Sequence, residues 1–167
     1  MPTVLFICTA NRFRSPLAEA AFKKCLKEDG CQTGWDVESA GLWTEGKLSP
    51  FPTAIKAAKE MGLDTIRTHR AQQITSEMLA KYDLVIVMQA SQKEAIQIEF
   101  PETTGKITLL SEIVEGFAYD IPDPFETVEE SHQELAEEIC GLVKRGYKRI
   151  SDLAESRENK PCTQAFQ

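Results

Sequence analysis

Long apolar segments are missing from this chain of 167 residues. The N-terminal apolar run, residues 4–7, is far shorter than the core of a signal peptide and follows no basic residue. Nowhere does the sequence approach the roughly 18–20 apolar residues that cross a bilayer. We therefore expect a protein that has no membrane partner and stays in the cytoplasm.

An excess of positive charge is missing as well. Lys and Arg number 19 against 26 Asp and Glu, which gives a formal net charge of −7. A protein that binds nucleic acid needs a basic surface to neutralise the backbone phosphates, so we expect no nucleic-acid partner. A negative total still allows a locally positive pocket.

Cysteine pairs and histidine clusters are scarce. The five cysteines are Cys8, Cys25, Cys31, Cys140 and Cys162. An odd number at irregular spacing is not a disulfide framework. The two histidines, His69 and His132, lie far apart in the sequence, so they do not form a recognisable set of zinc ligands. We predict no metal and no cofactor, and expect any functional cysteine to act as a single thiolate.

What the sequence does contain is an alternation of strand and helix patterns. Strands are expected at residues 3–7, 36–40, 84–88 and 106–110. Helices are expected at 16–28, 52–61, 75–81, 91–100 and 128–153, with a long loop at 111–127. This alternation predicts a small doubly wound, flavodoxin-like α/β domain over residues 1–155, a four-stranded parallel sheet with helices on both faces. Residues 156–167 are expected to form a flexible tail.

The segment that carries the chemistry is residues 8–16, Cys-Thr-Ala-Asn-Arg-Phe-Arg-Ser-Pro, between the first strand and the first helix. In a doubly wound sheet, ligands bind beyond the carboxyl ends of the strands. Backbone N–H groups of such a loop, together with those that begin the helix, can surround an anion. Arg14 can hold two phosphate oxygens with its planar guanidinium.

The same donors would act on Cys8. They stabilise a thiolate, so Cys8 should be ionised and nucleophilic at neutral pH. Ser15 can donate a hydrogen bond to the sulfur, and Asn11 can hold the loop conformation. The alternative is a buried strand cysteine beside a surface arginine. The preceding strand, the asparagine and the Ser-Pro helix start favour a functional loop.

This arrangement resembles the low-molecular-weight protein tyrosine phosphatases. The similarity covers about residues 3–153 and extends to Glu38-Ser39-Ala40-Gly41, His69-Arg70-Ala71, the strand at 83–88 and Pro122-Asp123-Pro124-Phe125. The resemblance implies hydrolysis of phosphate monoesters on a protein or peptide through a cysteinyl-phosphate on Cys8. The phosphate-binding loop would include Thr9, Ala10, Asn11, Arg12, Phe13 and Ser15. We also expect a monomer.

The resemblance assigns the general acid to Asp123, in the family's Asp-Pro-[Tyr/Phe] loop. The leaving oxygen of a phosphate monoester must be protonated, and the same carboxylate can then deprotonate the attacking water. The alternative is a tight turn in which the aspartate serves the backbone.

Three further residues are weaker candidates. The resemblance implies that His69 supports the loop by a hydrogen bond to Asn11; the alternative is an ordinary turn histidine. Trp43 and Phe125 could form walls for an aromatic substrate ring, or could be ordinary packing.

The chain departs from the family at three loop positions. Phe13 stands where most relatives have a second cysteine that captures an oxidised nucleophile, so oxidation of Cys8 should be harder to reverse. Arg12 stands at a position linked to discrimination between phosphotyrosine and phosphoarginine. Its charge would repel a cationic neighbourhood, which favours phosphotyrosine. Ala10 replaces the usual glycine, which requires a backbone without positive φ.

Three other functions stay open. A protein arginine phosphatase uses the same scaffold. An arsenate reductase also uses it, but needs two further cysteines near the middle of the chain, and there are none between Cys31 and Cys140. A non-catalytic phosphate-binding module would need neither Asp123 nor Arg14.

Overall fold

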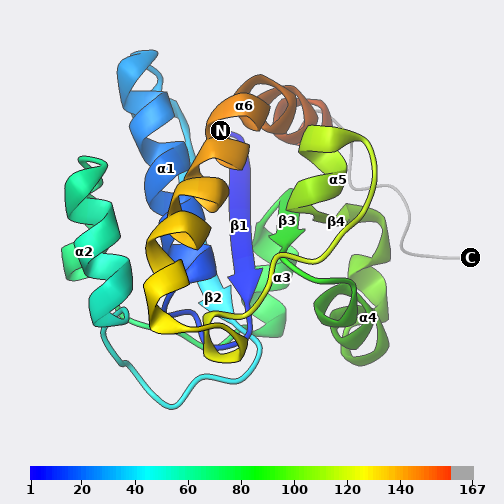
Figure 1. Cartoon of the computed structure of the whole chain (residues 1–167). Helices are drawn as coiled ribbons and strands as arrows, with labels where there is room; N and C mark the ends of the chain where they lie inside the picture. Colours follow the sequence, from blue (N-terminus) through cyan, green and yellow to red (C-terminus); the bar gives the residue numbers. More distant parts are fainter. Residues whose placement is uncertain (159–167) are drawn as a thin grey trace, which may run out of the picture.

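The computed structural model describes residues 1–158, so Cys162 and the predicted tail from residue 159 onward lie outside the described residues. One parallel sheet lies at its centre, with strand order β2-β1-β3-β4 (Figure 1). The strands are β1 (Thr3–Cys8), β2 (Asp36–Gly41), β3 (Leu84–Val87) and β4 (Ile107–Leu109). The predicted fold class is confirmed.

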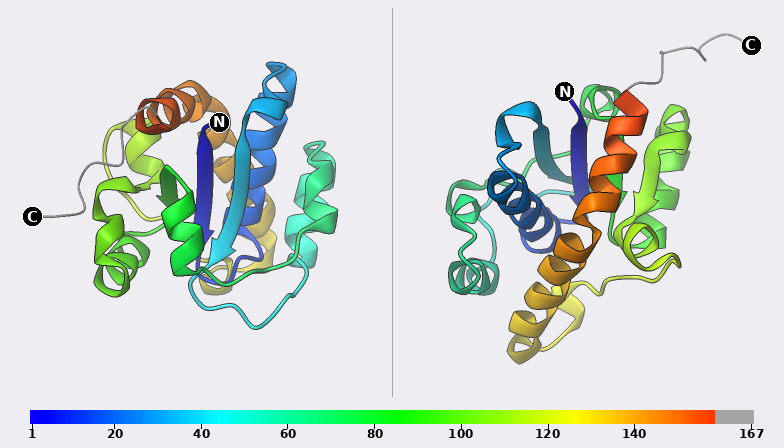
Figure 2. Two further views of the ribbon diagram at one scale, coloured as in Figure 1. Left: turned by 180° about the vertical axis from the view of Figure 1, so that it is seen from behind. Right: turned by 90° about the horizontal axis from the view of Figure 1, so that it is seen from above.

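Helices cover both faces of this sheet. They are α1 (Arg14–Glu28), α2 (Pro52–Glu60), α3 (Ser76–Lys81), α4 (Ala90–Glu99), α5 (Leu110–Glu115) and α6 (His132–Glu158). Short 3₁₀ helices occupy Gln32–Gly34, Asp64–Thr68, Pro101–Lys106, Pro124–Glu126 and Glu129–Ser131. Two views from other sides show α1, α2, α5 and α6 on one face of the sheet and α3 and α4 on the other (Figure 2).

Alternation along β1 divides the core into two layers. Val4 and Phe6 point into the layer formed with α1, α2, α5 and α6. Leu5 and Ile7 point into the layer formed with α3 and α4. All four side chains are fully buried, because β1 lies inside a sheet that is covered on both faces. None of the helices within residues 1–158 is long and apolar enough to span a membrane.

The largest differences from the sequence prediction are one unpredicted helix and the two ends of α6, while other helix boundaries shift by one or two residues. The loop expected at 111–127 begins with α5, whose Leu110 and Val114 are buried and which ends at Gly116 with φ of 83°. Helix α6 begins at His132 rather than at residue 128, because the 3₁₀ turn Glu129–Ser131 precedes it. It continues to Glu158, so residues 156–158 of the predicted tail are helical.

The carboxyl ends of β1, β2 and β3 lie along one edge of the sheet, since the strands are parallel. Cys8 is the last residue of β1, and its register partner in β2 is Gly41. The segment 116–123 returns to the same edge, where the backbone N–H of Ile121 donates to the carbonyl of Met88, 2.9 Å away. This edge therefore gathers the predicted loop and the predicted acid.

Candidate active site

Cys8 lies at the base of a surface depression. Its lining residues are Cys8, Ala10, Arg12, Phe13, Arg14, Phe51, Asp123, Pro124 and Phe125. The Sγ of Cys8 lies 3.0 Å from the hydroxyl oxygen of Ser15, at the start of α1. Cys8 is only 2% exposed, so a reagent reaches its sulfur through this depression. The two residues expected to flank a reacting phosphate, Arg14 and Asp123, share this lining.

Asn11 holds the shape of the 8–15 loop. Among the non-glycine residues that the structure describes, only Asn11 has positive φ, 58°, so Ala10 avoids the conformation that would have required glycine. The amide nitrogen of Asn11 donates to the hydroxyls of Ser15 and Ser39 at 2.8 and 3.0 Å. Its amide oxygen accepts from the backbone N–H of Gln72 at 3.0 Å. The fully buried side chain of Asn11 therefore holds the loop in place through hydrogen bonds to Ser15, Ser39 and Gln72.

Two neighbours support this loop from outside. The Nε2 of His69 lies 2.9 Å from the carbonyl oxygen of Asn11, the contact that the resemblance implied. Gly41 lies so close to the loop that a Cβ there would be 2.7 Å from the carbonyl oxygen of Thr9. These contacts fix the backbone whose N–H groups would face a phosphate.

Arg14 is a buried cation, 2% exposed. Its Nη1 donates to the carbonyl of Ile121 at 3.0 Å, and its Nη2 lies 3.3 Å from the carboxylate of Asp123. A buried guanidinium needs such partners because desolvation is costly. The pair joins the 8–15 loop to the segment that carries the predicted acid.

Asp123 makes the turn contact that its sequence allowed, and it also lies beside Arg14. One carboxylate oxygen accepts from the backbone N–H of Phe125 at 3.0 Å, which is the contact of a turn aspartate. The other faces Arg14. The side chain is 21% exposed and lines the depression, so solvent and substrate can reach it.

Aromatic side chains form the rim. The rings of Phe51 and Phe125 meet edge to face with centroids 4.8 Å apart, and Phe125 is 72% exposed. The guanidinium carbon of Arg12 lies 4.3 Å from the centroid of Phe51, and its Nε donates to the carbonyl of Ser49 at 2.7 Å. Trp43 is also exposed, but it is not one of the residues that line the depression.

Sequence reasoning missed two residues of this site. Phe51 was one, although its place between Pro50 and Pro52 ahead of a helical pattern was a usable signal. Gln92 was the other: it is 2% exposed, and its amide nitrogen donates to the hydroxyl of Thr9 at 3.2 Å. Its position in the first turn of α4 gave no sign of that contact.

The remaining described cysteines are poor candidates for the nucleophile. Burial raises the pKa of the Cys140 thiol to about 12, and it also raises the pKa of Cys25 above its ordinary value. Both thiols are therefore protonated at neutral pH. Cys31 is exposed and lies outside the depression. Phe13 is buried where the resemblance expects a second cysteine, so the difficult reversal of Cys8 oxidation stays a prediction.

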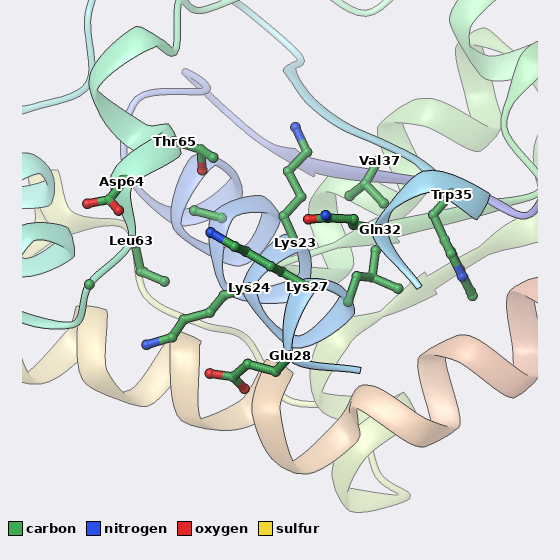
Figure 3. A pocket seen from close by; sticks show the side chains of 13 residues that line it. Lys23, Lys24, Lys27, Glu28, Gln32, Trp35, Val37, Leu63, Asp64 and Thr65 are labelled. Carbon is green, nitrogen blue, oxygen red and sulfur yellow. The ribbon is translucent and has the colours of Figure 1, made fainter. Parts of the chain in front are cut away.

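A larger cavity, of about 680 Å³, lies elsewhere (Figure 3). Its walls come from α1, from the turn before β2 and from the segment after α2, and they carry Lys23, Lys24 and Lys27. Lys23 pairs with Glu19 at 2.6 Å, and Lys24 donates to the carbonyl of Met61 at 2.9 Å. Neither cysteine nor histidine lines this cavity. No group of histidine, cysteine or carboxylate side chains within residues 1–158 is arranged to hold a metal ion.

Comparison with known proteins agrees with this geometry. The family model "Low molecular weight phosphotyrosine protein phosphatase" matches residues 3–158. A relative from Ralstonia nicotianae named "Probable low molecular weight protein-tyrosine-phosphatase EpsP" is 34% identical over 90% of this chain and 97% of its own length. A relative from Bacillus subtilis named "Protein-arginine-phosphatase" is 30% identical over 88% of this chain and 95% of its own length.

A solved structure from the same family has a similar fold. The crystal structure of the low molecular weight protein tyrosine phosphatase from T. tengcongensis superposes with a TM-score of 0.80 at 34% identity, covering 89% of this chain and 99% of that one. The family model spans nearly all of the described chain, including both the 8–15 loop and Asp123. The chain therefore belongs to the low molecular weight phosphotyrosine protein phosphatase family, a family of hydrolases.

Proposed function

We propose that this phosphatase removes phosphate from tyrosine side chains of proteins, with Cys8 as nucleophile, Arg14 as phosphate ligand and Asp123 as general acid and base. The observation that carries the proposal is that all three side chains line one depression, with Ser15 3.0 Å from the sulfur. That is the set of groups that transfer of a phosphoryl group to a thiolate requires.

In the first step the Cys8 thiolate attacks phosphorus and the bond to the phenolic oxygen breaks. The transferred group carries its charge on three equatorial oxygens, which the guanidinium of Arg14 and the N–H groups of the 8–15 loop would bind. Asp123 gives its proton to the departing oxygen, which leaves as tyrosine. Cysteinyl-phosphate and a tyrosine hydroxyl are the products.

In the second step a water molecule attacks the cysteinyl-phosphate. The Asp123 carboxylate accepts a proton from that water while the sulfur–phosphorus bond breaks. Inorganic phosphate forms, the acid is restored, and the sulfur leaves as a thiolate. A hydrogen bond from Ser15 to the sulfur would stabilise that thiolate as it departs.

Substitutions and leaving groups test these roles. Replacing Cys8 by Ser should abolish hydrolysis of aryl phosphates. Asp123→Ala should slow phenyl phosphate, a poor leaving group, by about 10²–10³-fold, and slow a dinitrophenyl ester far less. Equal losses for the two esters would exclude Asp123 as the acid. Turnover by the parent enzyme in EDTA, blocked by vanadate, would support the cysteine mechanism over a binding module.

Phosphoarginine is the second candidate substrate, since a relative at 30% identity is named a protein-arginine-phosphatase. The rim favours phosphotyrosine instead. The cation of Arg12 stands over the ring of Phe51, where it would repel a second guanidinium, while the exposed ring of Phe125 offers a face to a flat ring. A panel of matched peptides carrying phosphotyrosine, phosphoarginine or phosphoserine decides between them through kcat/KM.

The proposal includes a monomer in the cytoplasm that acts on phosphorylated proteins and does not bind nucleic acid. All four described cysteines are free thiols, as in a reducing compartment. Light scattering across a range of concentrations tests the monomer, cell fractionation tests the location, and titration with duplex DNA at low salt tests the absence of nucleic-acid binding.

A further inference from the structure

His132, the first residue of α6, contacts three separate segments around the active site. Its Nε2 lies 2.9 Å from the carbonyl oxygen of Pro124, the residue after Asp123. Its Nδ1 lies 2.9 Å from the hydroxyl of Thr53, in the first turn of α2. Its ring meets the ring of Phe13 edge to face, with centroids 5.4 Å apart.

These partners define which tautomer a neutral imidazole adopts. A carbonyl oxygen only accepts, so Nε2 must carry a proton and donate to Pro124. In the neutral ring Nδ1 is then an acceptor, and the hydroxyl of Thr53 can donate to it. Both ring nitrogens thus have a partner of the right kind. The histidine is held in one orientation by groups from two other elements.

Together with other hydrogen bonds, the contacts of His132 connect the segments that surround the depression. The backbone N–H of Phe51, next to α2, donates to the carbonyl of Arg12 at 2.9 Å, which ties α2 to the 8–15 loop. Arg14 ties the same loop to Ile121 and Asp123. His132 adds a hydrogen-bonded link from α2 to Pro124, the residue after Asp123, beside the edge-to-face contact of Phe51 with Phe125.

We infer that His132 is a positioning residue, which sets the distance between the Asp123 carboxylate and the leaving oxygen by holding the Pro124 carbonyl against α2 and Phe13. The inference rests on the proposed role of Asp123 as general acid. Proton transfer depends steeply on the separation of donor and acceptor, so a loop that drifts by an ångström loses much of the benefit of the acid. His132 itself is not one of the residues that line the depression.

Two substitutions separate the contacts of His132. His132→Phe keeps an aromatic ring against Phe13 but removes both hydrogen bonds. His132→Gln offers an amide that can donate to Pro124 and accept from Thr53, but it removes the ring. Glu134→Ala, an exposed residue in the same turn of α6, is the matched control and should leave kcat unchanged.

The measurement is kcat for phenyl phosphate and for a dinitrophenyl ester, with thermal unfolding of each variant. We expect His132→Phe to lower kcat for phenyl phosphate about tenfold and for the dinitrophenyl ester less than about twofold. His132→Gln should recover most of the loss. A folded His132→Phe that loses the same factor with both esters, or none, would overturn the inference.

A double-mutant cycle with Asp123→Ala keeps the test decisive if the single variants are less stable. If His132 acts through Asp123, His132→Phe should lower kcat for phenyl phosphate no further once Asp123 is alanine. Independent, multiplying losses would mean that His132 only stabilises the fold. Should Asp123→Ala itself show no dependence on the leaving group, the proposed acid fails, and that result is distinct from failure of the His132 link.

Discussion

The guanidinium of Arg14 lies 3.3 Å from the carboxylate of Asp123, although 109 residues separate them along the chain. The same guanidinium donates to the carbonyl of Ile121 at 3.0 Å. The proposed phosphate ligand therefore also anchors the segment that carries the proposed acid. The proposed binding of phosphate and the proposed placement of the proton donor thus both depend on the Arg14 side chain.

Arg14→Lys should lower kcat/KM for aryl phosphates about 10²-fold or more, because an ammonium cannot present a planar fork to phosphate while reaching Ile121. Steady-state kinetics with phenyl phosphate measure the loss. Arg145→Lys is the matched control: Arg145 pairs with Glu115 on the surface, 2.9 Å away, and its replacement should leave kcat/KM unchanged. An Arg14→Lys enzyme as active as the control would exclude a bidentate role.

Asn11 tests how much of the loop depends on its hydrogen bonds and how much on its backbone. Asn11→Gly keeps the positive φ but abandons the partners Ser15, Ser39 and Gln72, at a cost of about 1–3 kcal/mol of unfolding free energy. Asn11→Ala should lose about 1 kcal/mol more, because its Cβ disfavours φ of 58°. Urea unfolding measures both. If alanine proved as stable as glycine, the loop would relax to another conformation when the amide is removed.

Thiol reactivity provides a test of the nucleophile that needs no substrate. If Cys8 has the proposed role of nucleophile, iodoacetamide at about pH 6.5 should label it before the exposed Cys31. Cys140 should stay unlabelled in the folded protein, because its pKa of about 12 keeps it protonated at that pH. Peptide mass spectrometry follows the sites, and loss of activity should track labelling of Cys8. Phosphate or vanadate should protect it; equal labelling with and without vanadate would argue against an anion over the sulfur.

The parts that sequence predicted are those fixed by local pattern. The apolar run 84–88 predicted a buried strand, and the Cys-x5-Arg-Ser-Pro segment was predicted to join a strand to a helix. The family resemblance assigned Asp123 to the site of Cys8, and parallel strands bring their carboxyl ends, with the loops that follow them, to one edge of the sheet. Because their loops meet at this edge, Cys8 and Asp123 line one depression.

The parts that sequence did not predict depend on contacts between distant segments. Phe51 reaches the rim because its backbone N–H donates to the carbonyl of Arg12, which lies 39 positions earlier in the sequence. Sequence periodicity does not predict a hydrogen bond of this kind. His132 faces Phe13 only because α6 begins where it does. Helix α5 has six residues, too few for a helical repeat to be visible in the sequence.

Helix α5 owes its place to packing against α6, and Gly146 makes that packing possible. A Cβ at Gly146 would clash with a methyl carbon of Val114 in α5. Gly146→Ala should therefore lower the unfolding free energy by about 1–3 kcal/mol, as overpacking does. Val114→Ala in the same chain should restore part of that loss.

Gly141, one turn earlier in α6, is the matched control. The nearest atom to a Cβ there is at the end of the long, exposed Arg145 side chain, 3.3 Å away. Gly141→Ala should thus raise the unfolding free energy by up to about 1 kcal/mol, the ordinary gain of alanine over glycine within a helix. Urea unfolding of the two variants gives opposite signs if the α5–α6 contact is as tight as the geometry requires. If both variants gained the same unfolding free energy, α5 could move away from α6 without loss of stability. The position of α5 would then not depend on its packing against Gly146.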